Sequence, residues 1–264
     1  MSDTLTGVDT ARVAGIVEGA SKTAMSYFRQ LLAVETKGDE SPVTMADKQV
    51  ESEIRSALST NWPGFGILGE EFGAEGLEKG SYWVVDPIDG TRSFISGLPL
   101  FGMLLGLVQD GKPVLGIVGM PALGEIYVGE KGRGATLNGQ VIAASGKTRL
   151  SDATLFINEG EKLAVQEPHL FAALCQTGAT RRMSYDCYPH ALVASGHVDV
   201  VVDFDLQPYD YLPVVPLVEA AGGCMTDWEG NPLGLNSDGR VVSAATPELL
   251  ADTLALIAAK RRGA

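Results

Sequence analysis

Residues 83–91 bring an apolar run directly against two carboxylates, a glycine and a hydroxyl. The two valines of this run are typical of the buried end of a strand, and the proline that follows predicts that the strand stops there. Asp86 and Asp89 are three residues apart on the expected turn and can converge on one cation. The carbonyl of Ile88 offers a third, neutral oxygen. We therefore interpret this segment as a candidate metal site.

The two residues after the second carboxylate predict a phosphate contact. Gly90 permits a tight turn, and the backbone amides of Gly90 and Thr91 at a helix start would face an anion. An acidic surface turn is the simpler alternative, because Asp and Gly are common turn residues. That alternative does not explain the buried approach strand together with the Gly-Thr pair.

Two further carboxylates could join this site. Residues 66–71 form another apolar run that ends in acids, and Glu70 is the first of them. Two neighbouring strands that both end in acids would place Glu70 beside Asp86. Asp210 lies directly before a predicted helix that ends at residues 220–223. Taken alone, Asp210 is more typical of a helix N-cap than of a metal ligand, and the two roles are compatible.

Four motifs follow one another along nearly the whole chain. They are Lys37 with Ser41-Pro42-Val43-Thr44 and Asp47, then Gly69-Glu70-Glu71, then Asp86-Pro87-Ile88-Asp89-Gly90-Thr91, and finally Tyr209-Asp210 with Ala220-Ala221-Gly222-Gly223. In this order they resemble the motifs of the inositol monophosphatase-like family of magnesium-dependent, lithium-sensitive phosphatases. The family usually has Trp-Asp where this chain has Tyr209-Asp210. With residues 92–95, 186–188 and 206–208, that departure resembles the histidinol-phosphate phosphatase subgroup.

The resemblance implies an α/β (α+β) fold, a layered helix-sheet-helix-sheet-helix sandwich of the inositol monophosphatase / fructose-1,6-bisphosphatase type. We expect an N-terminal α+β lobe over residues 1–145 that binds the metal and phosphate. A C-terminal α/β lobe is expected over residues 146–264, and the two lobes would form one compact catalytic unit.

The apolar pattern agrees with alternating helices and strands. Apolar residues recur at helical spacing over residues 13–31, and a second helix is expected from about Asp47. The expected strands lie near residues 103–108, 114–120, 126–128, 155–157, 198–202 and 241–244, the first three antiparallel, with a hairpin turn at Asn138-Gly139; later helices are expected near 167–175, 189–195 and 247–259. In the helix after Asp210, Pro213 fits an opening turn, whereas Pro216 should kink the helix or shift its start.

The candidate ligands are all hard oxygen donors, which favours Mg²⁺ or Mn²⁺ over Zn²⁺. The resemblance assigns a first Mg²⁺ to Glu70, Asp86 and Ile88. It assigns a second to Asp86, Asp89 and Asp210, and a third, weaker ion also to Glu70. Two cations about 3.5–4 Å apart would hold the attacking and leaving oxygens on opposite sides of phosphorus.

The resemblance also assigns catalytic and phosphate-binding roles. With Glu70 among the catalytic residues, Thr91 and Asp47 would orient and deprotonate the attacking water. Gly90, Thr91 and Lys37 would contact the phosphate. Standing alone, Asp47 is more typical of a helix N-cap and Lys37 of a solvated loop lysine, so these two assignments rest on the resemblance.

Two more carboxylates favour a cationic substrate. Asp186 and Asp203 fall where the family has substrate-contacting residues, and Arg92 is a third substrate-binding candidate. Asp186 as a helix cap and Asp203 as a solvated strand end are the simpler alternatives. Histidinol phosphate carries an ammonium and an imidazole, so its pocket should offer anionic acceptors. Inositol 1-phosphate is the alternative substrate.

Composition limits the possible partners. The chain has 264 residues, 45% of them hydrophobic, which is enough to bury a sizeable core. A net charge of -13 argues against nucleic acid and membrane surfaces, and by resemblance we expect a homodimer acting on a small phosphorylated metabolite. Three cysteines without Cys-x-x-Cys spacing, and no signal peptide or membrane-spanning run, predict a cytoplasmic protein without disulfides.

Rival functions fit the same residues less well. A haloacid-dehalogenase-type phosphatase needs two Asp residues two positions apart, and Asp86 and Asp89 are three apart. An EF-hand needs alternating acidic ligands that end in a glutamate. His169, His190 and His197 lie in no nucleophile-elbow context, so we expect surface or packing roles for them. A catalytically inactive metal-binding scaffold should have lost a ligand or the threonine hydroxyl, and all are present.

Overall fold

The computed structural model describes residues 7–30, 34–36 and 42–261. Its helices are α1 (Thr10–Tyr27), α2 (Met45–Asn61), α3 (Thr91–Ile95), α4 (Gly160–Gln166), α5 (Pro168–Leu174), α6 (Tyr188–Ala194), α7 (Pro208–Tyr211), α8 (Val214–Ala220) and α9 (Pro247–Arg261), with short 3-10 turns η1 (Leu77–Lys79) and η2 (Leu150–Asp152). No helix in these ranges combines the length and the apolar character needed to cross a bilayer.

The strands of the described ranges form three sheets. They are β1 (Val34–Thr36), β2 (Pro42–Thr44), β3 (Gly66–Gly69), β4 (Gly73–Glu75), β5 (Ser81–Asp89), β6 (Gly102–Gln109), β7 (Lys112–Met120), β8 (Glu125–Glu130), β9 (Gly134–Leu137), β10 (Gln140–Ile142), β11 (Thr154–Asn158), β12 (Thr180–Ser184), β13 (Val200–Asp203), β14 (Cys224–Asp227) and β15 (Val241–Ala244). The sheet orders are β1-β2, β10-β9-β8-β7-β6-β5-β3-β4 and β12-β11-β13-β15-β14.

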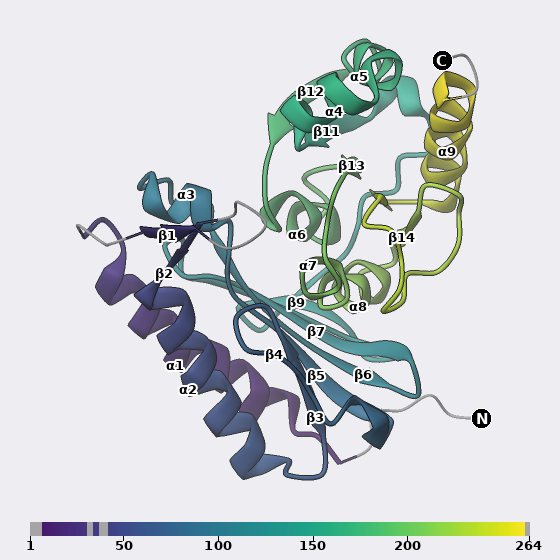
Figure 1. Cartoon of the computed structure of the whole chain (residues 1–264). Coiled ribbons are helices and arrows are strands. Elements are labelled where there is room, and N and C mark those ends of the chain that lie inside the picture. Colours follow the sequence, from purple (N-terminus) through teal and green to yellow (C-terminus); the bar gives the residue numbers. More distant parts are fainter. Residues whose placement is uncertain (1–6, 31–33, 37–41, 262–264) are drawn as a thin grey trace.

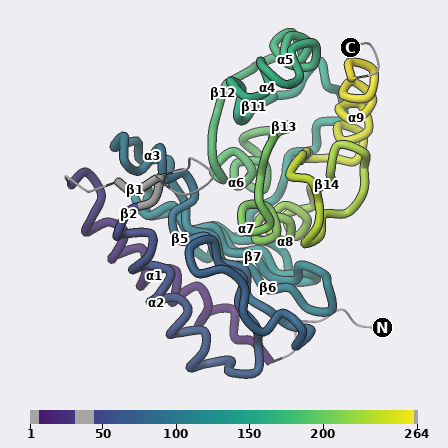
Figure 2. Tube along the Cα trace, viewed as in Figure 1, coloured from purple at the N-terminus to yellow at the C-terminus, as the bar shows by residue number. Residues whose placement is uncertain are grey.

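The layers follow the order helix, sheet, helix, sheet, helix. In Figure 1, α1 and α2 cover one face of the eight-stranded sheet, and α6, α7 and α8 lie between that sheet and the five-stranded one. The tube in Figure 2 shows the same path, with α4, α5 and α9 on the outer side of the second sheet. This arrangement confirms the predicted layered α/β sandwich. The lobe boundary near residues 145 and 146 stays a prediction.

Strand β5 is buried on both faces, because it runs through the middle of this layered structure. Trp83 and Val85 belong to the core under α1 and α2, whereas Tyr82 and Val84 belong to the core on the opposite face. A strand buried on both faces has a continuous apolar sequence, which explains the run that the sequence displays. Strand β3 pairs with β5 in parallel, so both strands end at the same edge of the sheet.

A stripe of glycines lets the helix layer approach the eight-stranded sheet. Gly106, Gly116 and Gly129 are direct neighbours on β6, β7 and β8. A Cβ at Gly116 would collide with the carbonyl of Pro213, and a Cβ at Gly129 would collide with the backbone of Leu217. The backbone around the start of α8 therefore rests directly on the sheet, which holds the preceding α7 close to the end of β5.

Three local predictions need correction. The strand over residues 83–86 does not stop at Pro87, because β5 continues to Asp89, with a shift in its pairing with β6 between Asp86 and Asp89. The first helix ends at Tyr27 and not at residue 31. Asp210 does not lie directly before the helix that ends near residue 220, because it is the third residue of a separate short helix, α7, whose N-cap is Gln207.

Other local predictions are confirmed. Asn138 and Gly139 form the turn between β9 and β10, both with positive φ (48° and 77°). Strands β6, β7 and β8 are antiparallel neighbours. The helix predicted after Asp210 is interrupted, and it restarts as α8 with Pro213 as N-cap and Pro216 in its first turn. The cysteines are all free thiols.

Candidate metal and phosphate site

Asp86, Asp89 and Asp210 converge at the end of β5 and the start of α7. Each offers a carboxylate oxygen, and these oxygens all lie within 4.8 Å of one another. Backbone amides fix the three side chains. The amide of Ile88 donates to Asp86 Oδ1 at 3.0 Å, that of Cys187 to Asp89 Oδ2 at 2.5 Å, and that of Gln207 to Asp210 Oδ2 at 2.7 Å. The sequence predicted this convergence, and the role of these residues as ligands stays a prediction.

Burial makes the charged form of this cluster unfavourable. It raises the pKa of Asp86 well above its usual value, and the charges of Glu70, Asp89 and Asp210 raise it further. The pKa of Asp210 is also raised, by burial and then by the charge of Asp89. Burial raises the pKa of Asp89 to about 6, although the amide of Cys187 opposes the shift. A divalent cation would compensate for this repulsion, so the donor set fits Mg²⁺.

These pKa shifts predict that the metal-free protein loses stability as pH rises. Asp186 contributes as well, because burial and then the charge of Asp89 raise its pKa to about 8. Since the folded state holds protons that the unfolded state has released above about pH 4, the free energy of unfolding should fall between pH 4 and about pH 8. In EDTA, the melting temperature should be lower at pH 8 than at pH 6. Saturating Mg²⁺ should raise the melting temperature more at pH 8 than at pH 6. Equal metal-free melting temperatures at the two pH values would contradict the raised pKa values.

Helix α2 carries the predicted partner of Thr91. Asp47 is the third residue of α2, and it accepts hydrogen bonds from the backbone amide of Thr44 at 2.9 Å and from its hydroxyl at 2.6 Å. Thr91, the first residue of α3, lies with its Oγ1 3.2 Å from Asp47 Oδ1 and 3.3 Å from the carbonyl oxygen of Ile88. Asp47 therefore has two roles: it completes the capping box of α2 with the N-cap residue Thr44, and it contacts Thr91. Lys37 lies outside the described residues.

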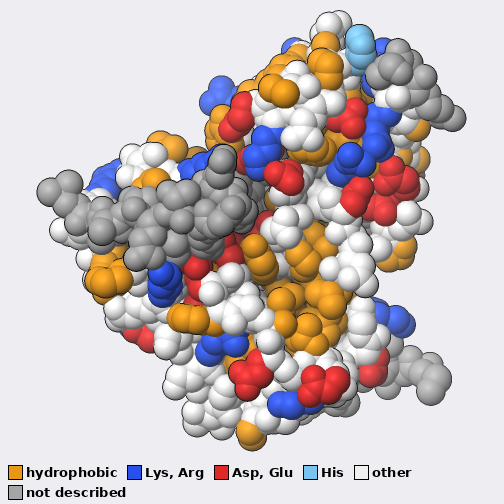
Figure 3. Space-filling model, in the orientation of Figure 1, with side chains coloured by type: hydrophobic (Ala, Val, Ile, Leu, Met, Phe, Trp, Pro, Cys, Tyr) orange, Lys and Arg blue, Asp and Glu red, His pale blue; other side chains and the backbone are white. Residues whose placement is uncertain are grey.

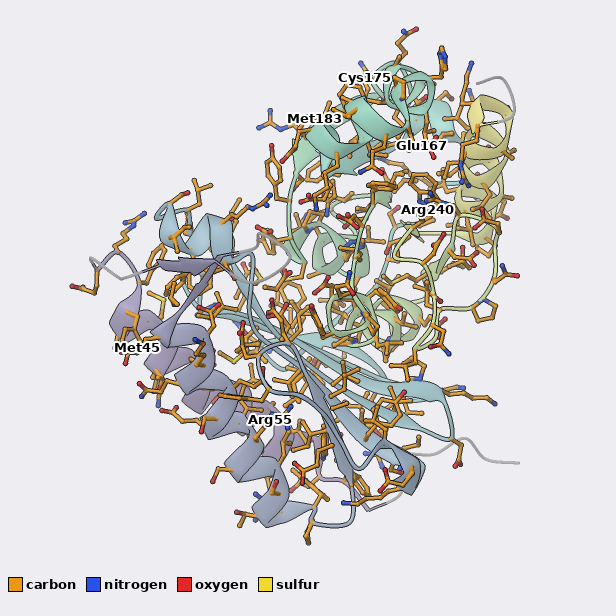
Figure 4. All side chains as sticks on the ribbon, viewed as in Figure 1. Met45, Arg55, Glu167, Cys175, Met183 and Arg240 are labelled. Atoms are coloured by element: carbon orange, nitrogen blue, oxygen red, sulfur yellow. The ribbon has the colours of Figure 1, made fainter. Side chains whose placement is uncertain are left out.

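The same helix also holds the turn that carries Glu70. The carboxylate of Glu51 is fully buried and accepts from the amides of Glu71 at 2.7 Å and Phe72 at 3.3 Å. Arg55, labelled on α2 in Figure 4, donates its Nε to Glu51 Oε1 at 2.7 Å. The backbone amide of Glu70 donates to the carbonyl of Val85 at 3.1 Å, which places Glu70 at the same sheet edge as Asp86. Sequence reasoning missed Glu51, since a glutamate in mid-helix carries no special signal.

A pocket extends from the carboxylate cluster. One part is lined by Asp86 and Ile88, and the adjoining part by Asp186 and Asp203. Both parts share several residues, namely Glu70, Asp89, Gly90, Thr91, Arg92, Lys162, Asp205 and Asp210. Figure 3 shows acidic side chains above and below the hollow between the two halves of the molecule. The structure thus brings the described candidate residues from both halves of the chain around one pocket, except Asp47, which is buried against Thr91 and does not line the pocket.

The simpler alternatives for the two carboxylates predicted to contact the substrate, Asp186 and Asp203, are wrong. Asp186 does not cap α6, whose N-cap is Cys187. Its φ is 62°, and its Oδ2 accepts from the hydroxyl of Ser93 at 2.6 Å. Asp203 is not a solvated strand end, because only 1% of it is exposed. One amide group connects the two residues, since Asn158 Nδ2 donates to Asp203 Oδ2 at 2.7 Å and to the carbonyl of Asp186 at 3.1 Å.

Sequence reasoning also missed other polar residues around the pocket. Lys162 pairs with Glu159 at 2.8 Å and with Asp205 at 3.1 Å, measured between Nζ and the carboxylate oxygens. His190 was expected to have a surface or packing role, but it is buried and hydrogen-bonded to Asp203. One signal was available for Asn158, because parallel strands β11 and β13 end together at Asn158 and Asp203.

Comparisons with known proteins agree with this arrangement. The sequence model described as "Inositol monophosphatase family" matches residues 6–262. A histidinol-phosphatase of Chlorobaculum parvum is 41% identical, covering 86% of this chain and 88% of its own. An inositol-1-monophosphatase of Mesorhizobium japonicum is 32% identical, covering 81% of this chain and 85% of its own.

A solved structure of an inositol monophosphatase from Zymomonas mobilis superposes with a TM-score of 0.85 and 36% identity, covering 95% of this chain and 97% of that one. The family generally depends on a metal, in keeping with the acidic cluster. The chain belongs to the inositol monophosphatase family, and it is a phosphatase, a phosphoric monoester hydrolase.

Proposed function

We propose that this phosphatase hydrolyses histidinol phosphate to histidinol and inorganic phosphate with the help of Mg²⁺. The main observation in favour of this substrate is that Asp186 and Asp203 line the same pocket as Asp89 and Asp210. Two carboxylates beside a phosphate site suit a substrate with an anionic end and a cationic end. Relatives named histidinol-phosphatase from several organisms support the same substrate.

The candidate ligands for Mg²⁺ are Asp86, Asp89, Asp210, Glu70 and the carbonyl of Ile88. Their oxygens suit Mg²⁺, with Mn²⁺ as an alternative, and two or three ions would share them. When bound, the metal would supply Lewis-acid stabilisation of the negative charge that develops on the phosphoryl and leaving oxygens.

The remaining residues orient the reactants. The Thr91 hydroxyl donates to Asp47, so its lone pairs can accept a hydrogen bond from the attacking water. That contact orients the water, and Asp47 is the acceptor toward which a proton moves through Thr91. The amides of Gly90 and Thr91, together with Lys37, would hold the phosphate.

At the other end of the substrate, Asp186 and Asp203 would accept from the ammonium and imidazole, and Arg92, which lines both parts of the pocket, would contact the substrate. The homodimer, the cytoplasmic location and the absence of nucleic-acid and membrane partners remain our proposals from the sequence.

Exchanging either carboxyl group for an amide should weaken the binding of histidinol phosphate selectively. Asp186→Asn and Asp203→Asn should each raise its KM about 10- to 100-fold more than that of glycerol 2-phosphate, since a hydrogen bond to a charged group is worth roughly 1.5–3 kcal/mol. Steady-state kinetics on the two esters measures this difference. The exposed Asp152, paired with Arg149, provides Asp152→Asn as a control that should change neither KM.

Two results would contradict the assignment of histidinol phosphate as the substrate. Inositol 1-phosphate could be the better substrate of the parent enzyme, or both variants could lose activity equally on charged and neutral esters. Either result would favour inositol-1-monophosphatase activity, which the relatives of that name also support.

A further inference from the structure

A buried line of hydrogen bonds runs from β15 through α6 to the end of β13. His190 Nδ1 lies 2.7 Å from the hydroxyl oxygen of Ser243, and His190 Nε2 lies 2.9 Å from Asp203 Oδ2. All three residues are at least 98% buried. A carboxylate can only accept, so Nε2 carries a proton and donates it to Asp203, while the hydroxyl of Ser243 pairs with Nδ1 on the other side of the ring. The contact with Ser243 therefore holds the ring in the orientation in which Nε2 donates to Asp203.

The carboxylate of Asp203 is held by donors on both oxygens. Oδ1 accepts from the amide of Phe204 at 2.7 Å, and Oδ2 accepts from Asn158 and from His190. A carboxylate offers about four lone-pair sites, and these three donors leave about one acceptor position. Asp203 lines the pocket and His190 does not, so a substrate group in the pocket is the candidate partner for the remaining position.

We propose that His190 is a positioning residue that determines specificity for a cationic alcohol by fixing the carboxylate of Asp203. This inference rests on the proposed function, and it adds a residue that does not touch the substrate. Without His190, Asp203 Oδ2 keeps one side-chain donor, and the carboxylate can rotate away from the orientation that accepts from an ammonium. Placement within about 0.5 Å decides whether such a charged contact forms.

The test is the specificity ratio, defined as kcat/KM for histidinol phosphate divided by kcat/KM for glycerol 2-phosphate. His190→Leu should lower this ratio about 10-fold, as expected for a misplaced charge-assisted hydrogen bond. His190→Gln, whose amide can donate to Asp203, should restore most of the ratio. Ser243→Ala should also lower the ratio, but by less. Because it is the smaller change, it tests the same point if His190→Leu does not fold. The exposed His197 gives the control His197→Leu, with an unchanged ratio.

A purely structural role for His190 would give a different result. His190→Leu and Ser243→Ala would then reduce kcat/KM for both esters in parallel, which would overturn the inference and leave the proposed function standing. A second check is the double variant Asp203→Asn with His190→Leu, whose specificity ratio should be no lower than that of Asp203→Asn alone. A parent enzyme without preference for histidinol phosphate would instead contradict the proposed function, and the ratio of the unmodified protein reports that outcome separately.

Discussion

Asp89→Asn and Asp210→Asn should each lower kcat about 1,000-fold or more while the protein stays folded. Each substitution removes one negative oxygen from the cluster whose carboxylates lie within 4.8 Å of one another. Metal stabilisation of the transition state is worth several kcal/mol, and each 1.36 kcal/mol is a factor of ten in rate. Phosphate release at saturating Mg²⁺ measures the loss, and circular dichroism shows whether the fold survives.

The fold should survive because the charges of this cluster oppose folding in the absence of metal. The raised pKa values of Asp89 and Asp210 imply that neutral side chains at these positions relieve repulsion. The metal-free variants should therefore melt no lower than the parent at pH 8. Asp252→Asn, on the exposed side of α9, is the matched control and should keep full activity. Near-normal turnover in both ligand variants would show that the metal site lies elsewhere.

Thr91→Ala should lower kcat about 100-fold or more with little effect on the Mg²⁺ affinity. Its hydroxyl lies 3.2 Å from Asp47 Oδ1, where it can orient a water and pass a proton, and such proton transfer contributes about 10²- to 10⁴-fold. Isothermal titration with Mg²⁺, run beside kinetics, separates the two effects. Thr91→Ser keeps the hydroxyl and should keep most of the rate. A large loss of Mg²⁺ affinity with little loss of kcat would instead assign Thr91 to the metal.

The sequence predicted the convergence of the acidic residues well, because most of them stand in short local patterns. Asp86 and Asp89 follow one buried strand, and Glu70 follows the parallel strand beside it. Parallel neighbours end at the same edge of a sheet, so the approach of Glu70 to Asp86 needed only the pairing of two strands. Asp210 is different. Its predicted role in the cluster rested on the family resemblance, and its observed position depends on the glycine stripe under α8.

The residues that the sequence did not reveal depend on long-range packing. His190 contacts Asp203 on β13 and Ser243 on β15, and no local pattern connects these positions. Glu51 is similar, since it holds a turn twenty residues further along the chain. The strand past Pro87 was also missed, because its irregular pairing with β6 removes the need for a hydrogen bond from that residue.

The most direct test of the account is phosphate release from a panel of esters by EDTA-treated protein before and after Mg²⁺ is added. The panel contains histidinol phosphate, inositol 1-phosphate, fructose 1,6-bisphosphate and adenosine 3′,5′-bisphosphate. We predict no activity before Mg²⁺ is added, and afterwards the highest kcat/KM for histidinol phosphate. Hydrolysis that persists in EDTA, or a higher kcat/KM for any other ester, would contradict the account.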